Sequence, residues 1–283
     1  MEAKDNEFKI TKEVLSGWGA SQIEFRIFNE HYNNKKYVKA SELLKLCAEL
    51  YYVKFGKWLV SKLPFNRTLL ILDHLDGHLF YNGNVYIKGD IDIKRKVAIK
   101  GNLKSNGALT VSDIGEIHAN RVKATKINLR DLAIIGAKTK ANIINMYAGV
   151  HINGNTIANT INIHDKSYIK RNVKANTINI HNKAYIERNV KANTININGN
   201  YAPIDNYVKA NVIHLLDFPC IKGNIEVDFI KLKYGCIQGN VNADEIINDG
   251  GLIDGNVNTF TIENINGGMV AGKITYKRSD EHK

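Results

Sequence analysis

The sequence lacks the long apolar run of a membrane-spanning segment. Its apolar stretches, such as residues 69–72, fall far short of the roughly 20 residues that a bilayer requires. Residues 1–11 are charged and mixed rather than apolar, so no signal peptide is expected. Cysteine is also scarce: the 3 cysteines, without a secretory context, favour a reducing, cytoplasmic location.

Signatures of catalysis are missing as well. The sequence contains no Gly-rich phosphate loop, no Ser/His/Asp pattern and no full set of metal ligands. His74 and His78 lie close to Asp73 and Asp76, but a structural or turn role fits them better than zinc binding. We therefore expect neither an enzyme nor a cofactor or small-molecule substrate.

Charge and apolar content indicate a folded, basic protein. The 283 residues are 44% apolar, which excludes a mainly disordered chain, and they include 39 Lys and Arg against 28 Asp and Glu. Residues 81–240 hold 23 basic and 11 acidic residues, whereas residues 1–80 hold 12 and 10, and residues 241–283 hold 4 and 7. The net charge of +11 therefore belongs to the middle of the chain.

An internal repeat with a step of roughly 17 residues dominates this middle part. Residues 169–180 (IKRNVKANTINI) recur almost unchanged as residues 186–197 (IERNVKANTINI). One position of the repeat holds Ala124, Ala141, Ala158, Ala175, Ala192 and Ala210. Weaker copies extend the repeat from Val85 to Ile274.

Each unit contains three pairs of apolar residues spaced two apart, which is the period of a β-strand. In one unit the pairs are Val173 with Ala175, Ile178 with Ile180, and Ala184 with Ile186. Three short strands per turn predict a mainly β fold, a triangular parallel β-helix of about 12 turns and about 17 residues per turn. We place this rod at residues 81–276, after an N-terminal domain of residues 1–80 and before a polar tail of residues 277–283.

Asparagine recurs at the same step in two series, and stacked Asn amides can hydrogen-bond along the rod axis. The series are Asn128, Asn145, Asn162, Asn179 and Asn196, and Asn142, Asn159, Asn176 and Asn193. Asn and Gly also tolerate the positive φ of tight corners.

Five segments are variants of one I-x-G-N-V unit: residues 87–91 (IKGDI), 99–103 (IKGNL), 221–225 (IKGNI), 237–241 (IQGNV) and 253–257 (IDGNV). Over about residues 82–276 the chain resembles the bactofilins, bacterial polymer-forming cytoskeletal proteins. The resemblance implies a right-handed triangular β-helix that assembles end to end without nucleotide and scaffolds other proteins, often at the membrane. The long rod and the folded region before it depart from the family pattern, because that region could cover one end.

The last turn is expected to be open to self-assembly. An uncapped end of a β-helix presents unpaired N–H and C=O groups, which form a template for another copy. The last turn carries Phe260, Met269 and Val270, followed only by the short tail. Phe260 either supplies an apolar contact between copies or simply plugs the turn.

Residues 1–80 lack the repeat and read as a small α or α+β domain. Residues 40–50 have apolar residues at helical spacing, with Ser41 as the expected N-cap. Residues 55–63 predict a second helix that ends at Pro64.

Residues 37–46 (YVKASELLKL), followed by residues 54–59 (KFGKWL), are similar to the KilA-N DNA-binding module over about residues 25–75. This resemblance implies that Lys54, Lys57 and Lys62 approach phosphate. Lys39 and Ser41 replace the Asn and Thr of the family pattern. The alternative is a helical cap that shields the first turn of the rod.

Basic side chains also recur at the repeat step. Each of these lysines precedes an inward residue and therefore points outward: Lys123, Lys140, Lys174, Lys191 and Lys209. Arg171 and Arg188 stack likewise, as do Lys166 and Lys183. Like charges one strand apart repel, so an anionic membrane surface or nucleic acid is a reasonable partner. The alternative is that the lysines keep the sheet face soluble.

Two further pairs fall one turn apart. Cys220 and Cys236 come within disulfide range, but parallel in-register strands aim their Cβ atoms poorly, so we expect two reduced thiols. His164 and His181 are expected to stack outward.

Together these patterns favour a cytoplasmic structural protein that forms a homo-oligomer or filament and adheres through its basic faces to an anionic surface, at the inner face of a membrane for example. The competing hypothesis is a DNA-binding protein in which residues 1–80 contact the duplex. Acyltransferases with left-handed β-helices run on 18-residue turns and a loop with a catalytic His, neither of which is present.

Overall fold

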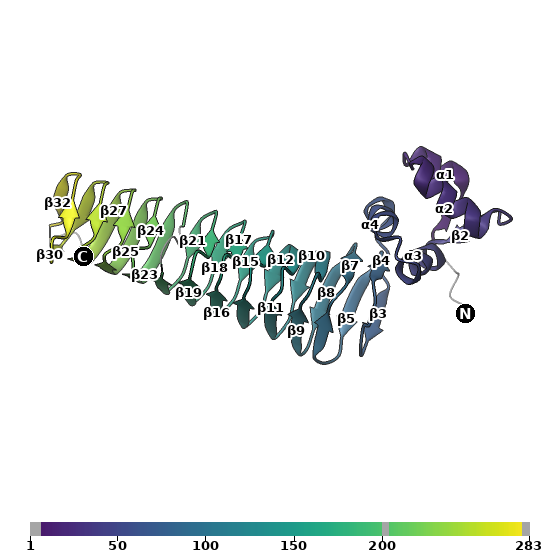
Figure 1. The fold of residues 1–283 in the computed structure, drawn as a ribbon, viewed down its shortest axis with the longest axis horizontal. Coiled ribbons are helices and arrows are strands. Elements are labelled where there is room, and N and C mark those ends of the chain that lie inside the picture. The colour runs from purple at the N-terminus through teal and green to yellow at the C-terminus, as the bar shows by residue number, and fades with distance from the viewer. Residues whose placement is uncertain (1–6, 200–203, 279–283) are drawn as a thin grey trace.

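The computed structural model describes residues 7–199 and 204–278 and shows a long rod with a helical unit at its N-terminal end (Figure 1). Strand makes up 47% of the structure and helix 14%. The rod is a parallel β-solenoid of about 12 coils with about 17 residues per coil, which confirms the predicted fold class. Most of the predicted polar tail, from residue 279 onward, lies outside the described residues.

The helical unit consists of short strands β1 (Lys9–Ile10) and β2 (Val38–Lys39) and helices α1 (Lys12–Gly17), α2 (Gln22–Tyr32), α3 (Ala40–Glu49) and α4 (Val53–Lys62). A capping box of Ser21 and Glu24 starts α2. Lys39 occupies the N-cap of α3, so the prediction that Ser41 caps this helix is wrong. Helix α4 ends before Pro64, as predicted, because the residue preceding a proline avoids helical geometry.

Three ladders of parallel strands form the sides of the rod. The first ladder, here called the lysine face, contains β3 (Leu69–Leu72), β5 (Asn84–Ile87), β8 (Asn102–Ser105), β10 (Glu116–Lys123), β12 (Ile134–Lys140), β15 (Thr156–Ile157), β18 (Val173–Lys174), β21 (Val190–Lys191), β23 (Val208–Leu216), β25 (Ile225–Lys233), β27 (Val241–Asp249), β29 (Val257–Thr259) and β32 (Ile274–Tyr276).

The second ladder, the aromatic face, contains β4 (Leu79–Tyr81), β7 (Lys96–Ile99), the first residues of β10 and β12, β14 (His151–Ile152), β17 (Tyr168–Ile169), β20 (Tyr185–Ile186), β24 (Cys220–Ile221), β26 (Cys236–Ile237), β28 (Leu252–Ile253) and β31 (Met269–Val270). Ile204 bridges Ile186 and Ile221 in this ladder.

The third ladder, the asparagine face, contains β6 (Ile91–Ile93), β9 (Ala108–Val111), β11 (Lys126–Leu129), β13 (Ile143–Met146), β16 (Thr160–Ile163), β19 (Thr177–His181), β22 (Thr194–Asn198), the last residues of β23, β25 and β27, and β30 (Thr261–Ile265). Strand β3 pairs with β5, and β4 pairs with β7, so the rod begins at residue 69. Residues 69–80 were predicted to belong to the N-terminal domain because the repeat is not visible there.

Alternate side chains of every strand fill the interior of the rod. The alanines of the repeat are buried, as predicted, and Ile178 and Ile180 are fully buried between the equivalent isoleucines of neighbouring coils. These residues belong to one continuous apolar cluster that runs from Val85 to Val257. Burial of this column stabilises the rod, because each coil covers the apolar face of the next.

The corners between strands have two different backbone arrangements. Positive φ occurs at paired non-glycine residues between the asparagine and aromatic faces, for example Asp165 with Lys166. The glycines of the I-x-G-N-V units serve another purpose: a Cβ on Gly239 would lie 2.3 Å from the carbonyl oxygen of Gly223. The corners at Gly101, Gly223, Gly239 and Gly255 therefore exclude a side chain because neighbouring backbones approach closely, whereas Gly89 has open space beside it.

The helical unit packs against the first coils. Helices α3 and α4 contact β4, and α4 also contacts β7. Phe80 and Ala98 share a buried cluster with the helical residues. Gly56 permits this approach, since a Cβ there would lie 2.3 Å from the ring of Phe80. The helices thus cover the start of the aromatic face.

Candidate binding surface

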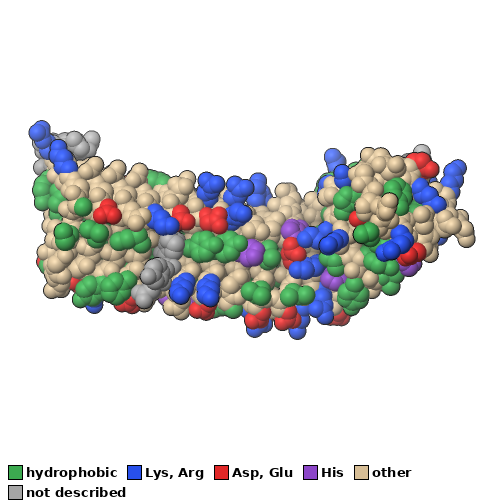
Figure 2. Space-filling model, turned by 45° about the horizontal axis from the view of Figure 1, so that its top comes forward, with side chains coloured by type: hydrophobic (Ala, Val, Ile, Leu, Met, Phe, Trp, Pro, Cys, Tyr) green, Lys and Arg blue, Asp and Glu red, His purple; other side chains and the backbone are tan. Residues whose placement is uncertain are grey.

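The predicted basic residues form a row along the lysine face. Lys123 pairs with Lys140 across neighbouring strands, and Lys174, Lys191 and Lys209 follow one another in the same way. Ile157 interrupts the row, because it pairs with Lys140 on one side and with Lys174 on the other. Figure 2 shows Lys and Arg side chains gathered over the middle coils.

Lys104 belongs to this row and was missed by the sequence analysis. It pairs with Lys123, and its amine lies 5.3 Å from the centre of the Tyr86 ring. The repeat pattern could have identified Lys104, because Leu103 occupies the same position in the repeat as Val122 and Lys104 directly follows it.

Glu226 ends the row on its C-terminal side. Its carboxylate accepts hydrogen bonds from Lys209 and from the hydroxyl of Tyr207. The hydrogen bonds from Lys209 and then Tyr207 lower the pKa of Glu226, and the bond to Glu226 raises the pKa of Tyr207 to about 12. Within residues 7–199 and 204–278, by contrast, Lys123, Lys140, Lys174 and Lys191 form no ion pair.

A groove of about 410 Å³ follows the lysine face across β15, β18, β21 and β23. Lys174 and Lys191 line one side of it, and Asn172 and Asn189 line the other. Each pair flanks the inward residue of its strand, so both rows point outward. The groove therefore exposes cations and amides side by side.

Arg171 and Arg188 lie at the corner that leads from the aromatic face to the lysine face. Both side chains are exposed, and each precedes a strand of the lysine face by two residues. The structure thus places them next to the groove, where they add to its positive charge.

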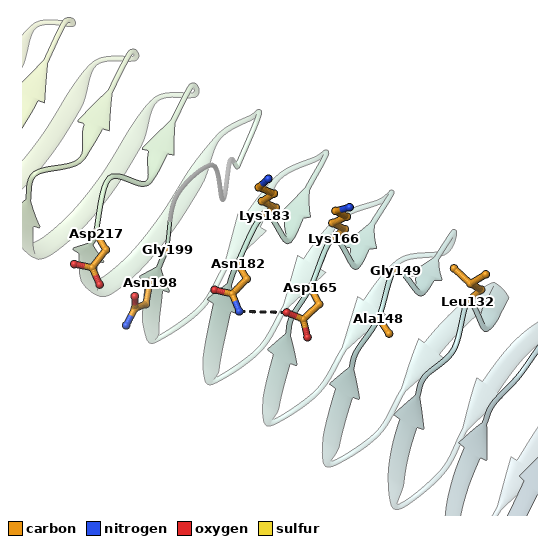
Figure 3. A pocket seen from close by; sticks show the side chains of 10 residues that line it. All are labelled: Leu132, Ala148, Gly149, Asp165, Lys166, Asn182, Lys183, Asn198, Gly199 and Asp217. Atoms are coloured by element: carbon orange, nitrogen blue, oxygen red, sulfur yellow. Dashed lines mark hydrogen bonds between the residues drawn. The ribbon is translucent and has the colours of Figure 1, made fainter.

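A second groove, of about 850 Å³, follows the corner between the asparagine and aromatic faces (Figure 3). Asn182 donates a hydrogen bond of 3.2 Å to the carboxylate of Asp165, one coil earlier. Lys166 and Lys183 also line this groove, on the side away from Asp165 and Asn182. Acidic, basic and amide groups alternate here, so the corner lacks the uniform positive charge of the lysine face.

The residues predicted for self-assembly lie in the last coil but differ in exposure. Met269 is 62% exposed, whereas Val270 packs partly against the core. Phe260 is half-buried, and the amine of Lys277 lies 5.1 Å from the centre of its ring. Lys277 is also bonded to Asp244. Met269 is thus the most accessible of the three.

The lysines proposed for DNA contact are not equivalent. Lys54 and Lys62 are exposed on α4, and Lys62 lies 5.9 Å from the centre of the Trp58 ring. Lys57 instead binds the rod, with its amine 3.0 Å from the carboxylate of Glu116. Contact of these residues with DNA stays a prediction.

Glu116 anchors the helical unit to the aromatic face. Desolvation by burial favours a raised pKa, but hydrogen bonds from His118, Lys57 and Lys96 outweigh it and lower the pKa of Glu116 to about 2. The Lys96 amine lies 3.1 Å from the carboxylate. This cluster joins α4 to the strands β7 and β10.

The histidines have structural contacts. His78 Nδ1 accepts a hydrogen bond of 3.1 Å from the backbone amide of Lys96, which agrees with its expected structural role. The rings of His164 and His181 stack with centres 4.6 Å apart, as predicted, and His164 also stacks on Tyr147. Among the residues that the structure describes, no three His, Cys, Asp or Glu side chains form a metal-binding group.

Cys220 and Cys236 form a disulfide, so the prediction of two reduced thiols is wrong. Their Cα atoms lie 4.5 Å apart on the paired strands β24 and β26. The predicted cytoplasmic location loses the support of reduced cysteines and stays a prediction, because disulfides persist mainly in oxidising compartments. None of the helices in the described part of the chain is long and apolar enough to cross a membrane.

The fold defines the chain as a parallel β-solenoid with a cationic side. Neither family models nor curated proteins nor solved structures provide a match to this chain. The resemblances to the bactofilins and to the KilA-N module therefore stay predictions from sequence.

Proposed function

We propose that this chain is a structural, scaffolding protein that assembles through the ends of its solenoid and adheres to an anionic partner through its lysine face. The observation that best supports this assembly is that the strands of the last coil are paired on one side only. Within the described residues, β30, β31 and β32 each pair with a single strand, which belongs to the preceding coil. A free strand edge is a template for another chain.

The exposed side chains at this end favour contact with a second copy. Ile262 and Ile274 pack against the core but are only partly buried. Met269 and Tyr276 are 62% and 61% exposed. Proteins protect free edges with charge, proline or a covering element, and β31 carries only Met and Val at its edge.

The first coil also keeps a free edge. Strand β3 pairs only with β5 among the described strands, and its Leu69 and Ile71 are more than half exposed. The main contacts of the helical unit with the rod are those with β4 and β7. The ladder of the lysine face is thus open at β3 and at β32 and can continue into neighbouring copies, whereas the helices cover the start of the aromatic face. End-to-end pairing of this kind is what the bactofilin resemblance implies.

The unpaired lysines support adhesion. Neighbouring strands lie about 4.8 Å apart, so the stacked lysines bring like charges close enough to repel. An anionic partner relieves this repulsion and releases counterions, so its binding weakens as salt rises.

Negative-stain electron microscopy and sedimentation velocity of the full chain test the assembly. We expect elongated multimers whose fraction rises with concentration and falls in Met269→Lys. The matched control is Leu132→Lys, because Leu132 is 66% exposed on the side of the rod and Lys166 occupies the equivalent position two coils later. Strictly monomeric particles across salt and concentration would contradict the proposed assembly.

A further inference from the structure

The groove on the lysine face offers two kinds of hydrogen-bonding group. Lys174 and Lys191 supply ammonium donors along one wall. Asn172 and Asn189 supply amides, each both donor and acceptor, along the other. A ligand that lies in this groove meets a cation and an amide on each of the two central coils, whereas the outer coils present Asn155 with Ile157 and Tyr207 with Lys209.

These side chains are available for a ligand. Within residues 7–199 and 204–278 neither Lys174 nor Lys191 has an ion-pair partner. Asn172 and Asn189 serve the sheet through their backbone carbonyls, which accept from Thr156 and Val173, while their side chains are exposed. The side chains of these four residues are therefore free to bind a ligand, whereas Lys209 and Tyr207, farther along the groove, are bonded to Glu226.

The repetition of the groove indicates a linear polymer. Lys174 and Lys191 pair directly across β18 and β21, so equivalent groups recur at a strand spacing of about 4.8 Å. A chain molecule with an anionic group on each short repeat unit can bind several coils at once, and linked contacts raise the overall affinity. Ile157 and Glu226 limit the cationic stretch at its two ends.

The amide wall favours carbohydrate over nucleic acid. Neutral amides match hydroxyl groups, which both donate and accept hydrogen bonds. Single-stranded nucleic acids gain affinity by stacking bases on aromatic side chains, but between Asn155 and Lys191 none of the described groove residues is aromatic. Tyr207, at the edge of the groove, is bonded to Glu226.

We propose that this groove binds a linear acidic polysaccharide, with carboxylates on Lys174 and Lys191 and hydroxyl groups on Asn172 and Asn189. This inference rests on the proposed anionic partner of the lysine face and specifies its chemistry. Charge-assisted hydrogen bonds supply affinity, and the amide row supplies the preference for a sugar chain.

Isothermal titration calorimetry of the full chain with polygalacturonate oligomers of defined length tests the inference. We expect binding that weakens as salt rises, and no binding of neutral oligosaccharides of the same length. Lys174→Gln with Lys191→Gln should weaken binding by about tenfold or more, because each lysine supplies a charge-assisted hydrogen bond. The matched control is Lys166→Gln with Lys183→Gln, which removes the same charge from the corner between the asparagine and aromatic faces and should bind as the unmodified chain does.

Asn172→Ala with Asn189→Ala distinguishes a sugar site from a simply cationic face. These substitutions leave the charge unchanged, and we expect severalfold weaker binding of the oligomer. Unchanged binding in this variant would overturn the inference, as would equal or tighter binding of polyphosphate, duplex DNA or anionic lipid vesicles. Equal or tighter binding of one of these three ligands would still support an anionic partner of the lysine face. The test of end-to-end assembly by microscopy is independent of all these binding results. Thermal unfolding of each variant verifies that it folds.

Discussion

Asn179 donates its side-chain amide to the side-chain oxygen of Asn162, one coil earlier, over 2.8 Å. The same bond joins Asn162 to Asn145 and Asn196 to Asn179, also over 2.8 Å. Each inner member of the series therefore donates one bond and accepts another in a half-buried position. Because every donor points to the preceding coil, the ladder holds neighbouring coils in one register.

Replacement of Asn162 tests the contribution of this ladder. Asn162→Ala removes one donated and one accepted bond, so the side-chain oxygen of Asn145 loses its donor and the side-chain NH2 of Asn179 loses its acceptor. We expect a loss of about 1–3 kcal/mol in the free energy of unfolding, measured by urea denaturation. Asn172→Ala, on the exposed lysine face, is the control and should change stability by no more than about 0.5 kcal/mol. Equal stability of the two variants would contradict a structural role for the ladder.

The column of isoleucines should be sensitive to loss of volume. Ile178 is fully buried between Ile161 and Ile195 of the neighbouring coils. Ile178→Ala is expected to lower the free energy of unfolding by about 2–5 kcal/mol, because it leaves a cavity in the rod. Ile178→Val should cost only about 0.5–1.5 kcal/mol. Chemical denaturation of both proteins measures the difference, and a similar cost for both would mean that the coils close around the cavity.

Docking of the helical unit should depend on pH. The pKa of Glu116 is lowered from 4.5 to about 2 in the folded protein, so its ionised form stabilises the contact with Lys57. This contribution is complete above the ordinary pKa and is lost as the pH falls from about 4.5 towards 2. Hydrogen exchange measured by mass spectrometry should therefore show weaker protection of α4 at pH 3 than at pH 6, after correction for intrinsic exchange rates.

Substitution of Glu116 separates this effect from general acid unfolding. Glu116→Gln should weaken the protection of α4 at pH 6 and reduce its further change at pH 3. Glu245→Gln, an exposed position far along the rod, should behave as the unmodified chain does. Unaltered α4 protection in Glu116→Gln would show that apolar packing around Phe80 alone holds the helices.

Alkylation counts the free thiols. Cys47 is buried, and burial raises its pKa to about 12, so the native protein should take up no iodoacetamide. Unfolded without reductant, the chain should take up one label, and with reductant three, because Cys220 and Cys236 are bonded. Three labels without reductant would contradict the disulfide.

The disulfide should also affect stability. It closes a sequence separation of 16 residues, for which cross-linking contributes about 3 kcal/mol. Reductant should therefore lower the free energy of unfolding of the native chain. Cys220→Ala with Cys236→Ala should start from the lower value and should not respond to reductant.

The regular part of the rod was accessible from sequence because its physics is local and repetitive. A period of two assigns Ala175, Ile178 and Ile180 to the interior, and the constant step between units aligns equivalent residues of neighbouring coils. The same argument placed Lys174 beside Lys191 and Asn162 beside Asn179, and both placements are confirmed. The helices at residues 40–50 and 55–63 followed from apolar spacing in the same way.

The sequence by itself determined which side chains face inward in the regular coils, because strand periodicity and the repeat leave one register that buries the isoleucine column of Ile161, Ile178 and Ile195. Only the tertiary structure decided that Lys57 meets Glu116, 59 residues away, and that Gly56 lies against Phe80, since docking depends on the shapes of two surfaces. It also decided the bond between Cys220 and Cys236, because periodicity brings two coils together without specifying how their Cβ atoms are aimed. The groove on the lysine face also depends on the tertiary structure. A single repeat supplies only one residue to each wall, so the walls form only when four strands stack.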